Sequence, residues 1–409
     1  MAKIVPFRAI RPSRDKVSLV ASRSYLSYSK EILVEKLENN PYTFLHIINP
    51  DYSAGYEVSS HDEKFKLVKE KFNSFIKEGI FQKDNSDSFY IYQKNNEDGN
   101  SFIGIIGAAS VIDYQNGNIK IHEQTIQKRE ELFKTYLQTT GFNAEPVLLT
   151  YPNHQSIDEI IKRYAQTRAE YEFTTTNKSQ HKLWLVSDEK DIQLIEQSFS
   201  EIENLYIADG HHRFASSSLL AKESKNINNS NTQYCMSYLI AEDQLKIISF
   251  NRLLKNLNGL SNEDFLTQIK EKYEIKEVQK ALVPTQKDEI TLYVSRKWYS
   301  LIAKEEYVNR THCVEKLDPA ILSNNILAPI LGITDPRNDK RLAFIDGTHS
   351  LEEIKHKVDS EEFKAAFVLK PISVNQIKEV ADQGQSMPPK STYIQPKLRS
   401  GMLIYDFED

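Results

Sequence analysis

One stretch near the middle of the chain constrains the fold more than any other, because it specifies a strand, a tight turn and a helix in immediate succession. Residues 205–208 are apolar and predict a short buried strand, which Gly210 interrupts. Residues 211–222 include good helix formers and no proline, so they predict a helix directly after the turn. The turn therefore brings a strand end against a helix N-terminus.

The turn Asp209-Gly210-His211-His212-Arg213 has the chemical character of an anion site. The first N–H groups of a helix and the positive end of its dipole attract negative charge. Gly210 allows close backbone approach, Arg213 offers a planar fork to phosphate oxygens, and the two histidines are further donors. A metal site or a surface turn without function remains an alternative. Adjacent helical side chains point in different directions, so no metal ligand is assigned.

Length and composition limit the class of protein. A chain of 409 residues predicts two or three domains with ample core. The net charge of −5 and the absence of a basic block argue against nucleic acid. No apolar run is long enough to span a membrane, and the N-terminus lacks the apolar core of a signal peptide. Cys235 and Cys313 are too few for a disulfide framework or a structural zinc site. We expect a cytoplasmic protein.

Hydrophobic periodicity predicts helices and strands that alternate along the chain. Helical spacing is found at residues 30–38, 61–78, 156–171, 188–200, 263–273, 317–331 and 374–383. A buried strand is expected at 44–48, and strand pairs are expected within 89–112, 234–251 and 290–303. An Asn-rich loop at 226–232 predicts a domain boundary.

A second candidate feature is His122-Glu123, which follows the short predicted strand 119–121. The His-Glu-x-x-His pattern of zinc proteases is not met, because position 126 is isoleucine. A carboxylate at a strand end can serve as general base toward a hydroxyl. The alternative is an ordinary helix start in which Glu123 and Thr125 act as caps.

The C-terminal tail combines stiff and phosphate-binding residue types. Residues 387–401 contain three prolines together with the candidates Lys390, Ser391, Thr392 and Lys397. Lysines and hydroxyls on a proline-stiffened loop could close over phosphates, and a solvated turn is the alternative.

Four motifs in this order resemble one bacterial family: Pro6-Phe7-Arg8, residues 121–125, Ala208 to Arg213 and residues 387–393. Together they are similar to the SerK-like family, long catalogued as a conserved domain of unknown function, over nearly the whole chain. That family is similar to the ParB/sulfiredoxin superfamily, and some shorter relatives are free-serine kinases that use ADP or ATP. The resemblance implies an α+β fold with a ParB/sulfiredoxin-like core and additional α/β segments at both ends. The expected divisions are 1–115, 116–230 (the nucleotide-binding core) and 231–409.

The resemblance also implies roles for the candidate residues. The phosphates of ATP or ADP, with Mg²⁺, would lie on Gly210-His211-His212-Arg213. Glu123 would act as general base in the family's His-Glu motif, beside His122. Asp209 could hold the metal or orient a histidine. Lys390, Ser391, Thr392 and Lys397 would close over the nucleotide.

Three functions remain open at this point. The first is a nucleotide-dependent small-molecule kinase acting on a hydroxyl substrate such as L-serine. The second is a nucleotide-binding regulator of the ParB-like type without kinase activity. The third, a sulfiredoxin-like reductase, needs a cysteine in the motif, where His211 and His212 stand instead.

Overall fold

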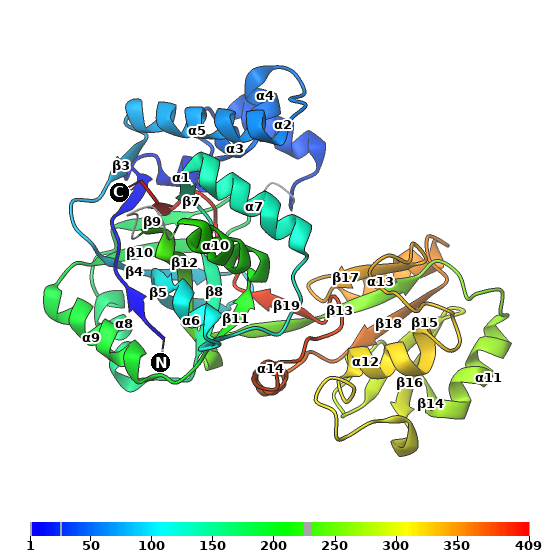
Figure 1. Ribbon diagram of the computed structural model, residues 1–409. Coiled ribbons are helices and arrows are strands. Elements are labelled where there is room, and N and C mark those ends of the chain that lie inside the picture. The colour runs from blue at the N-terminus through cyan, green and yellow to red at the C-terminus, as the bar shows by residue number, and fades with distance from the viewer. Residues whose placement is uncertain (1, 25–26, 225–230, 409) are drawn as a thin grey trace. The chain divides into compact units, whose positions relative to one another are not determined.

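The computed structural model describes residues 2–24, 27–224 and 231–408, and contacts divide the chain into two compact units (Figure 1). The first unit comprises Met1–Lys120, Thr125–Leu245 and Pro396–Asp409, and the second comprises Ile121–Gln124 and Lys246–Gln395. Both units combine helices with β-sheets, so the expected α+β class is confirmed. The large sheet of the first unit contains parallel and antiparallel pairs, and the sheet of the second unit is antiparallel. The expected three-part division of the sequence stays a prediction, and residues 225–230 of its Asn-rich boundary lie outside the described part.

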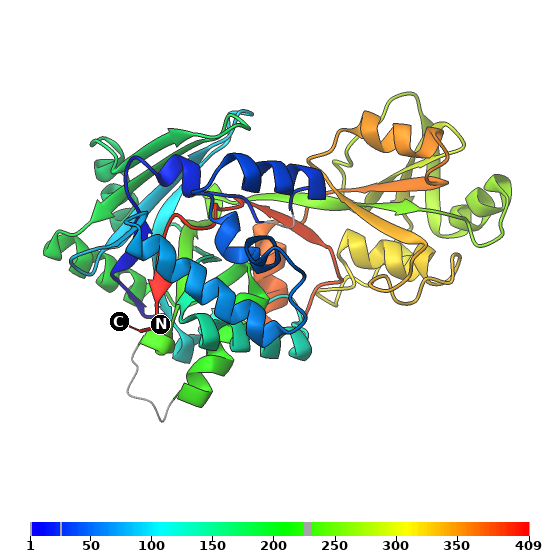
Figure 2. The same ribbon diagram turned by 90° about the horizontal axis from the view of Figure 1, so that it is seen from above.

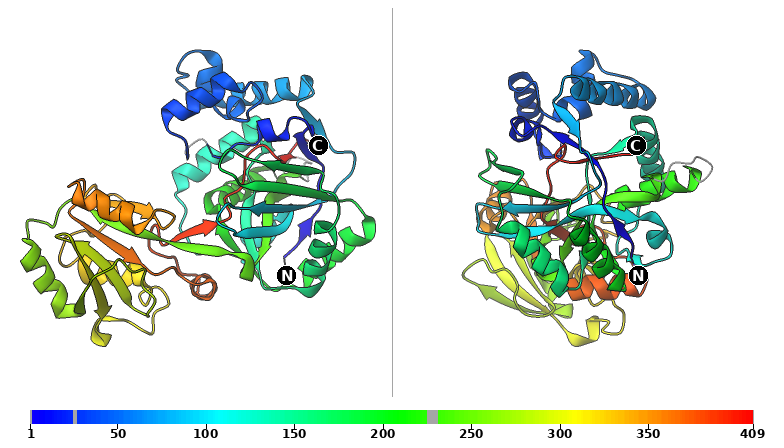
Figure 3. Two further views of the ribbon diagram at one scale, coloured as in Figure 1. Left: turned by 180° about the vertical axis from the view of Figure 1, so that it is seen from behind. Right: turned by 90° about the vertical axis from the view of Figure 1, so that its left-hand side faces the viewer.

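A nine-stranded sheet forms the centre of the first unit, and Figure 3 shows it from behind. Its strand order is β6-β11-β8-β12-β5-β4-β10-β9, and β1 pairs with β5. The strands are β1 (Ile4–Val5), β4 (Phe89–Asn95), β5 (Ser101–Ser110), β6 (Ile119–Lys120), β8 (Val147–Tyr151), β9 (Tyr171–Thr174), β10 (Gln180–Val186), β11 (Leu205–Asp209) and β12 (Tyr234–Ala241).

Apolar side chains of four helices pack against one face of this sheet to form its main core. Val111, Ile157, Phe199 and Phe214 each contribute from a different helix. The helices are α6 (Val111–Gln115), α8 (Gln155–Ala165), α9 (Glu189–Glu201) and α10 (His211–Glu223).

A four-stranded sheet with the order β3-β2-β20-β7 packs against Val20, Ile47, Phe72 and Tyr136, which come from four different helices. Figure 2 shows these helices in blue to blue-green. The C-terminal strand β20 is thus placed between β2 near the N-terminus and β7 in the middle of the chain. The elements are β2 (Ala9–Pro12), α1 (Val17–Val20), α2 (Lys30–Asn39), α3 (Leu45–Ile48), α4 (Pro50–Ala54), α5 (His61–Lys77), β3 (Phe81–Lys83), α7 (Gln127–Thr140), β7 (Phe142–Asn143) and β20 (Ile404–Asp406).

The second unit contains a seven-stranded sheet of order β14-β16-β15-β18-β13-β17, with β19 paired to β13. Its strands are β13 (Lys246–Leu254), β14 (Tyr273–Val278), β15 (Glu289–Val294), β16 (Lys297–Ala303), β17 (Leu342–Asp346), β18 (Ala365–Leu369) and β19 (Thr392–Gln395). Its helices are α11 (Asn262–Lys272), α12 (Asp318–Leu322) with a π-helical turn at Ser323–Leu327, α13 (Leu351–Asp359) and α14 (Val374–Asp382).

Three expectations about local structure are wrong. Residues 44–48 form helix α3 instead of a strand, because a short apolar run fits a buried helix as well as a strand. β12 and β13 do not pair: β12 lies between β5 and β8, whereas β13 pairs with β17, β18 and β19. Glu123 and Thr125 do not cap the next helix, since α7 begins only after its N-cap Ile126.

Among the residues that the structure describes, none of the helices combines the length and the apolar character that crossing a bilayer requires.

Candidate functional site

The predicted strand–turn–helix is present in the first unit. Strand β11 ends at Asp209 and helix α10 begins at His211, so Gly210 is the whole connection (Figure 1). Gly210 adopts φ 101°, in the left-handed region that side chains disfavour. A Cβ there would lie 2.9 Å from Nη2 of Arg213 and 3.0 Å from its Nε. Glycine is required twice, for the backbone conformation and for the space that the guanidinium occupies.

Arg213 folds back over the turn and holds two parts of the first unit together. Its Nη2 donates to Oδ2 of Asp209 at 2.9 Å, and its Nη1 donates to the backbone carbonyl of Pro146 at 2.7 Å. The carboxylate of Glu145 lies further away, 3.8 Å from Nη1. The guanidinium therefore ties the first turn of α10 to the segment that precedes β8.

The C-terminal segment reaches the same turn through Lys397. Its Nζ donates to Oδ1 of Asp209 at 2.6 Å, so the carboxylate of Asp209 lies between two cations. Asp209 and Lys397 are 188 residues apart in sequence. These contacts bring together four of the expected site residues: Asp209, Gly210, Arg213 and Lys397.

This arrangement tests the idea that Asp209 holds a metal. Magnesium needs oxygen ligands that are available in near-octahedral geometry. Both oxygens of Asp209 already accept charge-assisted hydrogen bonds, one from Arg213 and one from Lys397. Asp209 therefore holds the two cations in position, and because each of its oxygens has a further lone pair, metal binding by Asp209 stays a prediction.

The two histidines of the turn differ in environment. The side chain of His211 is buried, and that of His212 is partly exposed. The backbone carbonyl of His212 accepts a hydrogen bond from Ser216 Oγ at 2.7 Å, within the first turns of α10. Adjacent positions on the helix thus present the two rings to different surroundings, as expected from helical geometry.

His122 and Glu123 belong to the second unit, whereas the turn belongs to the first. His122 is fully buried, and its backbone carbonyl accepts a hydrogen bond from the backbone N–H of Met387 at 2.9 Å. This bond joins the His-Glu motif to the start of the motif at residues 387–393. The side chain of Glu123 is exposed.

The four tail candidates do not form one loop. Lys390, Ser391 and Thr392 belong to the second unit, and Lys397 belongs to the first. The Lys390 ammonium lies over the Phe250 ring, 5.1 Å from its centroid. Buried Ser391 donates its hydroxyl to the Pro388 carbonyl at 2.6 Å, which stabilises the turn before β19.

Sequence reasoning missed Glu145 and Pro146, which flank the turn through Arg213. Glu145 and Pro146 are far from Arg213 in sequence and belong to no motif that includes it. The contact depends on the pairing of β11 with β8. No local signal could have identified them.

Comparison with known proteins identifies the family. The family described as "Protein of unknown function (DUF1015)" matches residues 4–320, more than three quarters of the chain. A search of the curated proteins found no match.

Among solved structures, a free serine kinase in complex with AMP is 15% identical, with 71% of this chain and 88% of that chain covered and a TM-score of 0.35. SbnI from Staphylococcus aureus, with a C-terminal truncation, is 14% identical, with 74% and 88% covered and a TM-score of 0.39. A conserved hypothetical protein from Pyrococcus furiosus is 16% identical, with 71% and 93% covered and a TM-score of 0.35. The family match covers most of the chain and includes both His122-Glu123 and the turn at residues 209–213, and on that basis this protein belongs to the DUF1015 family.

Proposed function

We propose that the protein is a nucleotide-dependent small-molecule kinase that binds phosphates at Gly210-His211-His212-Arg213. The observation that carries the proposal is the direct passage from β11 into α10 through left-handed Gly210. This geometry presents the N-terminal end of a thirteen-residue helix at a strand end, without a side-chain cap on its first turn. Such an end attracts phosphate through its backbone N–H groups and its dipole.

Arg213 and Lys397 supply the positive charge beside this helix end. Asp209 holds both cations, which fixes their positions before any ligand arrives. Fixed donors cost less reorganisation when charge develops on a transferring phosphoryl group. Arg213 has five N–H donors, and the structure uses two of its nitrogens for Asp209 and Pro146.

Glu123 is the proposed general base toward the acceptor hydroxyl. Its exposure supports this role, and so does the resemblance of His122-Glu123 to the His-Glu motif of free-serine kinases. The acceptor class is a small hydroxyl compound, and L-serine is the first candidate. Mg²⁺ would enter with the nucleotide phosphates.

Phosphoryl transfer by the purified chain tests the proposal. ATP or ADP with Mg²⁺ is offered together with L-serine, and phosphoserine is measured for wild type, Glu123→Gln and Arg213→Ala. We expect Glu123→Gln to lower kcat at least about a hundredfold with nucleotide affinity retained, as removal of a general base does. Arg213→Ala should weaken nucleotide binding and transfer together. Glu352→Gln, which changes an exposed carboxylate of the second unit, is the matched control.

The outcomes separate the competing functions. Nucleotide binding without transfer to any hydroxyl compound would favour a regulatory protein of the ParB-like type. Absence of nucleotide binding would remove the phosphate role of the turn. Full activity in Glu123→Gln would contradict the general-base assignment alone.

A further inference from the structure

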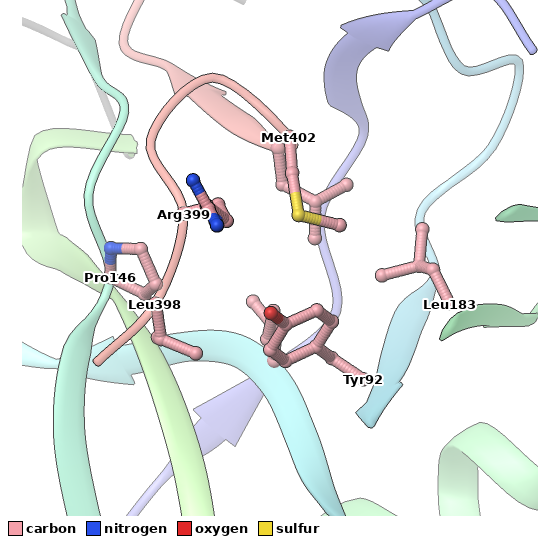
Figure 4. Close-up of a pocket in the computed structure, with 8 residues that line it drawn as sticks. Tyr92, Pro146, Leu183, Leu398, Arg399 and Met402 are labelled. Carbon is pink, nitrogen blue, oxygen red and sulfur yellow. The ribbon is translucent and has the colours of Figure 1, made fainter. Parts of the chain in front are cut away.

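A second group of cations lies in the first unit, on the part of the large sheet that the C-terminal segment covers. Figure 4 shows a small pocket there, with Arg399 and Met402 of that segment on one side and Tyr92 of β4 on the other. Pro146 and Leu183 complete its mainly apolar wall. The cavity measures about 10 Å³, which is room for about one water-sized group.

The register of the paired strands places two further polar side chains, Lys94 and His181, next to the pocket. On the paired strands β4 and β10, Tyr92 lies opposite Leu183 and Lys94 lies opposite His181. Residues two apart in a strand share a face, so Lys94 and His181 stand beside Tyr92 and Leu183 on the same side of the sheet. The hydroxyl of Tyr92 confirms this proximity, because it lies 2.7 Å from Nδ1 of His181.

The two cations at this site, Lys94 and Arg399, donate hydrogen bonds to neutral groups. Lys94 Nζ donates to the backbone carbonyl of Lys397 at 3.1 Å, and Arg399 Nη2 donates to Oδ1 of Asn177 at 2.7 Å. Within the described ranges, neither cation forms an ion pair with a carboxylate. Both residues are partly buried, and a partly buried charge without a counter-charge is unfavourable, so the site favours an anion.

The pKa of Lys94 agrees with the lack of a carboxylate partner in the described part of the chain. Burial, followed by the charge of Arg399, lowers the pKa of Lys94 to about 8. Asp98 acts in the opposite direction and Arg23 in the same direction, and both effects are smaller. Burial also lowers the pKa of the Arg399 guanidinium.

His181 adds a neutral donor. Burial, with Arg399 and Lys94 nearby, lowers its pKa to about 3, so the ring is uncharged at neutral pH. Its ring stacks between Tyr92 and Phe173. Burial raises the pKa of the Tyr92 hydroxyl, which lies 2.7 Å from Nδ1 of His181. When this hydroxyl donates to Nδ1, the proton of the neutral His181 ring is on Nε2. That nitrogen is buried and has no hydrogen-bond partner within the described ranges.

We propose that Arg399, Lys94 and His181 form an oxyanion-binding site, different from the turn at Gly210, which takes a carboxylate or phosphate group of a small ligand. The side chains offer cationic and N–H donors, and the pocket walls are otherwise apolar. One oxygen of the group matches the room in the cavity. The site borders the phosphate turn, because Pro146, which lines the pocket, also accepts the hydrogen bond from Arg213.

Calorimetric titration of the full chain at pH 8 in chloride-free buffer, with inorganic phosphate and separately with acetate, tests this site. Wild type should bind at least one of the two, and whichever binds more tightly identifies a phosphate or a carboxylate ligand. Arg399→Gln and Lys94→Met should each weaken binding about tenfold or more, as loss of a charge-assisted hydrogen bond does. Lys178→Gln, which changes an exposed lysine paired with Glu97 near the same strands, should bind as wild type does.

Two further readouts distinguish the site from the turn and from a purely structural role. Binding should raise the pKa of Lys94, so wild type should take up protons on titration at pH 8 and Lys94→Met should not. Saturating AMP should leave the binding intact. If neither anion binds wild type, or if Arg399→Gln binds unchanged, the proposal is wrong. Displacement of the anion by AMP would also overturn it, and would leave the proposed kinase function standing.

Discussion

Gly210 is the single residue on which the phosphate turn depends. Replacement by alanine puts a side chain at φ 101° and 2.9 Å from the Arg213 guanidinium. We expect Gly210→Ala to lower the free energy of unfolding by about 1–2 kcal/mol and to weaken nucleotide binding, because Arg213 must move. Urea denaturation and AMP titration measure the two effects.

Gly117 provides the matched control for that substitution. It also has a positive φ, 79°, but a Cβ there meets no atom within 4 Å. Gly117→Ala should therefore share the backbone strain and keep nucleotide affinity. Equal nucleotide binding by both variants would show that the Arg213 position is not important for the turn.

Asp318 makes the stability of the second unit depend on pH. Burial, then the charge of Asp288, raises its pKa to about 7 from an ordinary value of 3.8. The folded state thus holds this proton more tightly than the unfolded state. Its stabilising contribution is complete below about pH 4 and is lost as the pH rises through about 7.

We expect Asp318→Asn to remove this part of the pH dependence. In a Trp184→Phe background, Trp298 fluorescence reports urea unfolding of the second unit, because these are the two tryptophans of the chain. The urea midpoint of the protein with Asp318, minus the urea midpoint of the Asp318→Asn variant, should decrease as the pH rises from 4 to 7.5. Glu263→Gln, at an exposed carboxylate, should not alter the dependence, and a constant difference for Asp318→Asn would contradict the assignment.

At the scale of elements, the end of β11 anchors the C-terminal segment through Asp209. Removing its charge by Asp209→Asn weakens the hydrogen bonds from both Lys397 and Arg213. The side chains of Arg213, Asp209 and Lys397 are 22%, 36% and 42% exposed, so each pair contributes about 1 kcal/mol or less. We expect the amides of residues 397–400 to exchange hydrogen about fivefold faster.

The comparison for this experiment is Asp243→Asn. Asp243 accepts a hydrogen bond from Asn153 at an exposed position, and its substitution leaves the contacts of Asp209 with Lys397 and Arg213 in place, so exchange at residues 397–400 should match wild type. If Asp209→Asn gave the same result as this control, the tail would be held by its backbone pairing alone, for which Ser400 and Ser22 supply a bridge.

At the scale of the whole molecule, the chain enters the second unit and then returns to the first. The seven-stranded sheet lies entirely within residues 246–395, whereas the four-stranded sheet of the first unit needs β20 from the C-terminus. We expect residues 246–395 to melt cooperatively when expressed alone. Residues 1–245 should do so only when 396–409 are joined to them through a flexible linker.

Circular dichroism during heating measures both transitions. The linked polypeptide is the matched control, since it differs from residues 1–245 only by the linker and the returning segment. Cooperative melting of residues 1–245 at the same temperature as the linked form would contradict the structural role of β20. An unfolded 246–395 fragment would contradict the independence of the second unit.

Local sequence signals were sufficient to predict several elements. Helix α10, the turn at Gly210, helix α5 and the β15–β16 hairpin were predicted where the structure has them, because periodicity and turn chemistry act over a few residues. The family resemblance followed from short motifs in a fixed order. The strand partners of β12 and β13, and the contact between Asp209 and Lys397 across 188 residues, became known from the folded structure. Strand pairing and ion pairing across such separations depend on which buried faces meet in the folded chain. A pattern within a few neighbouring residues does not specify which faces these are.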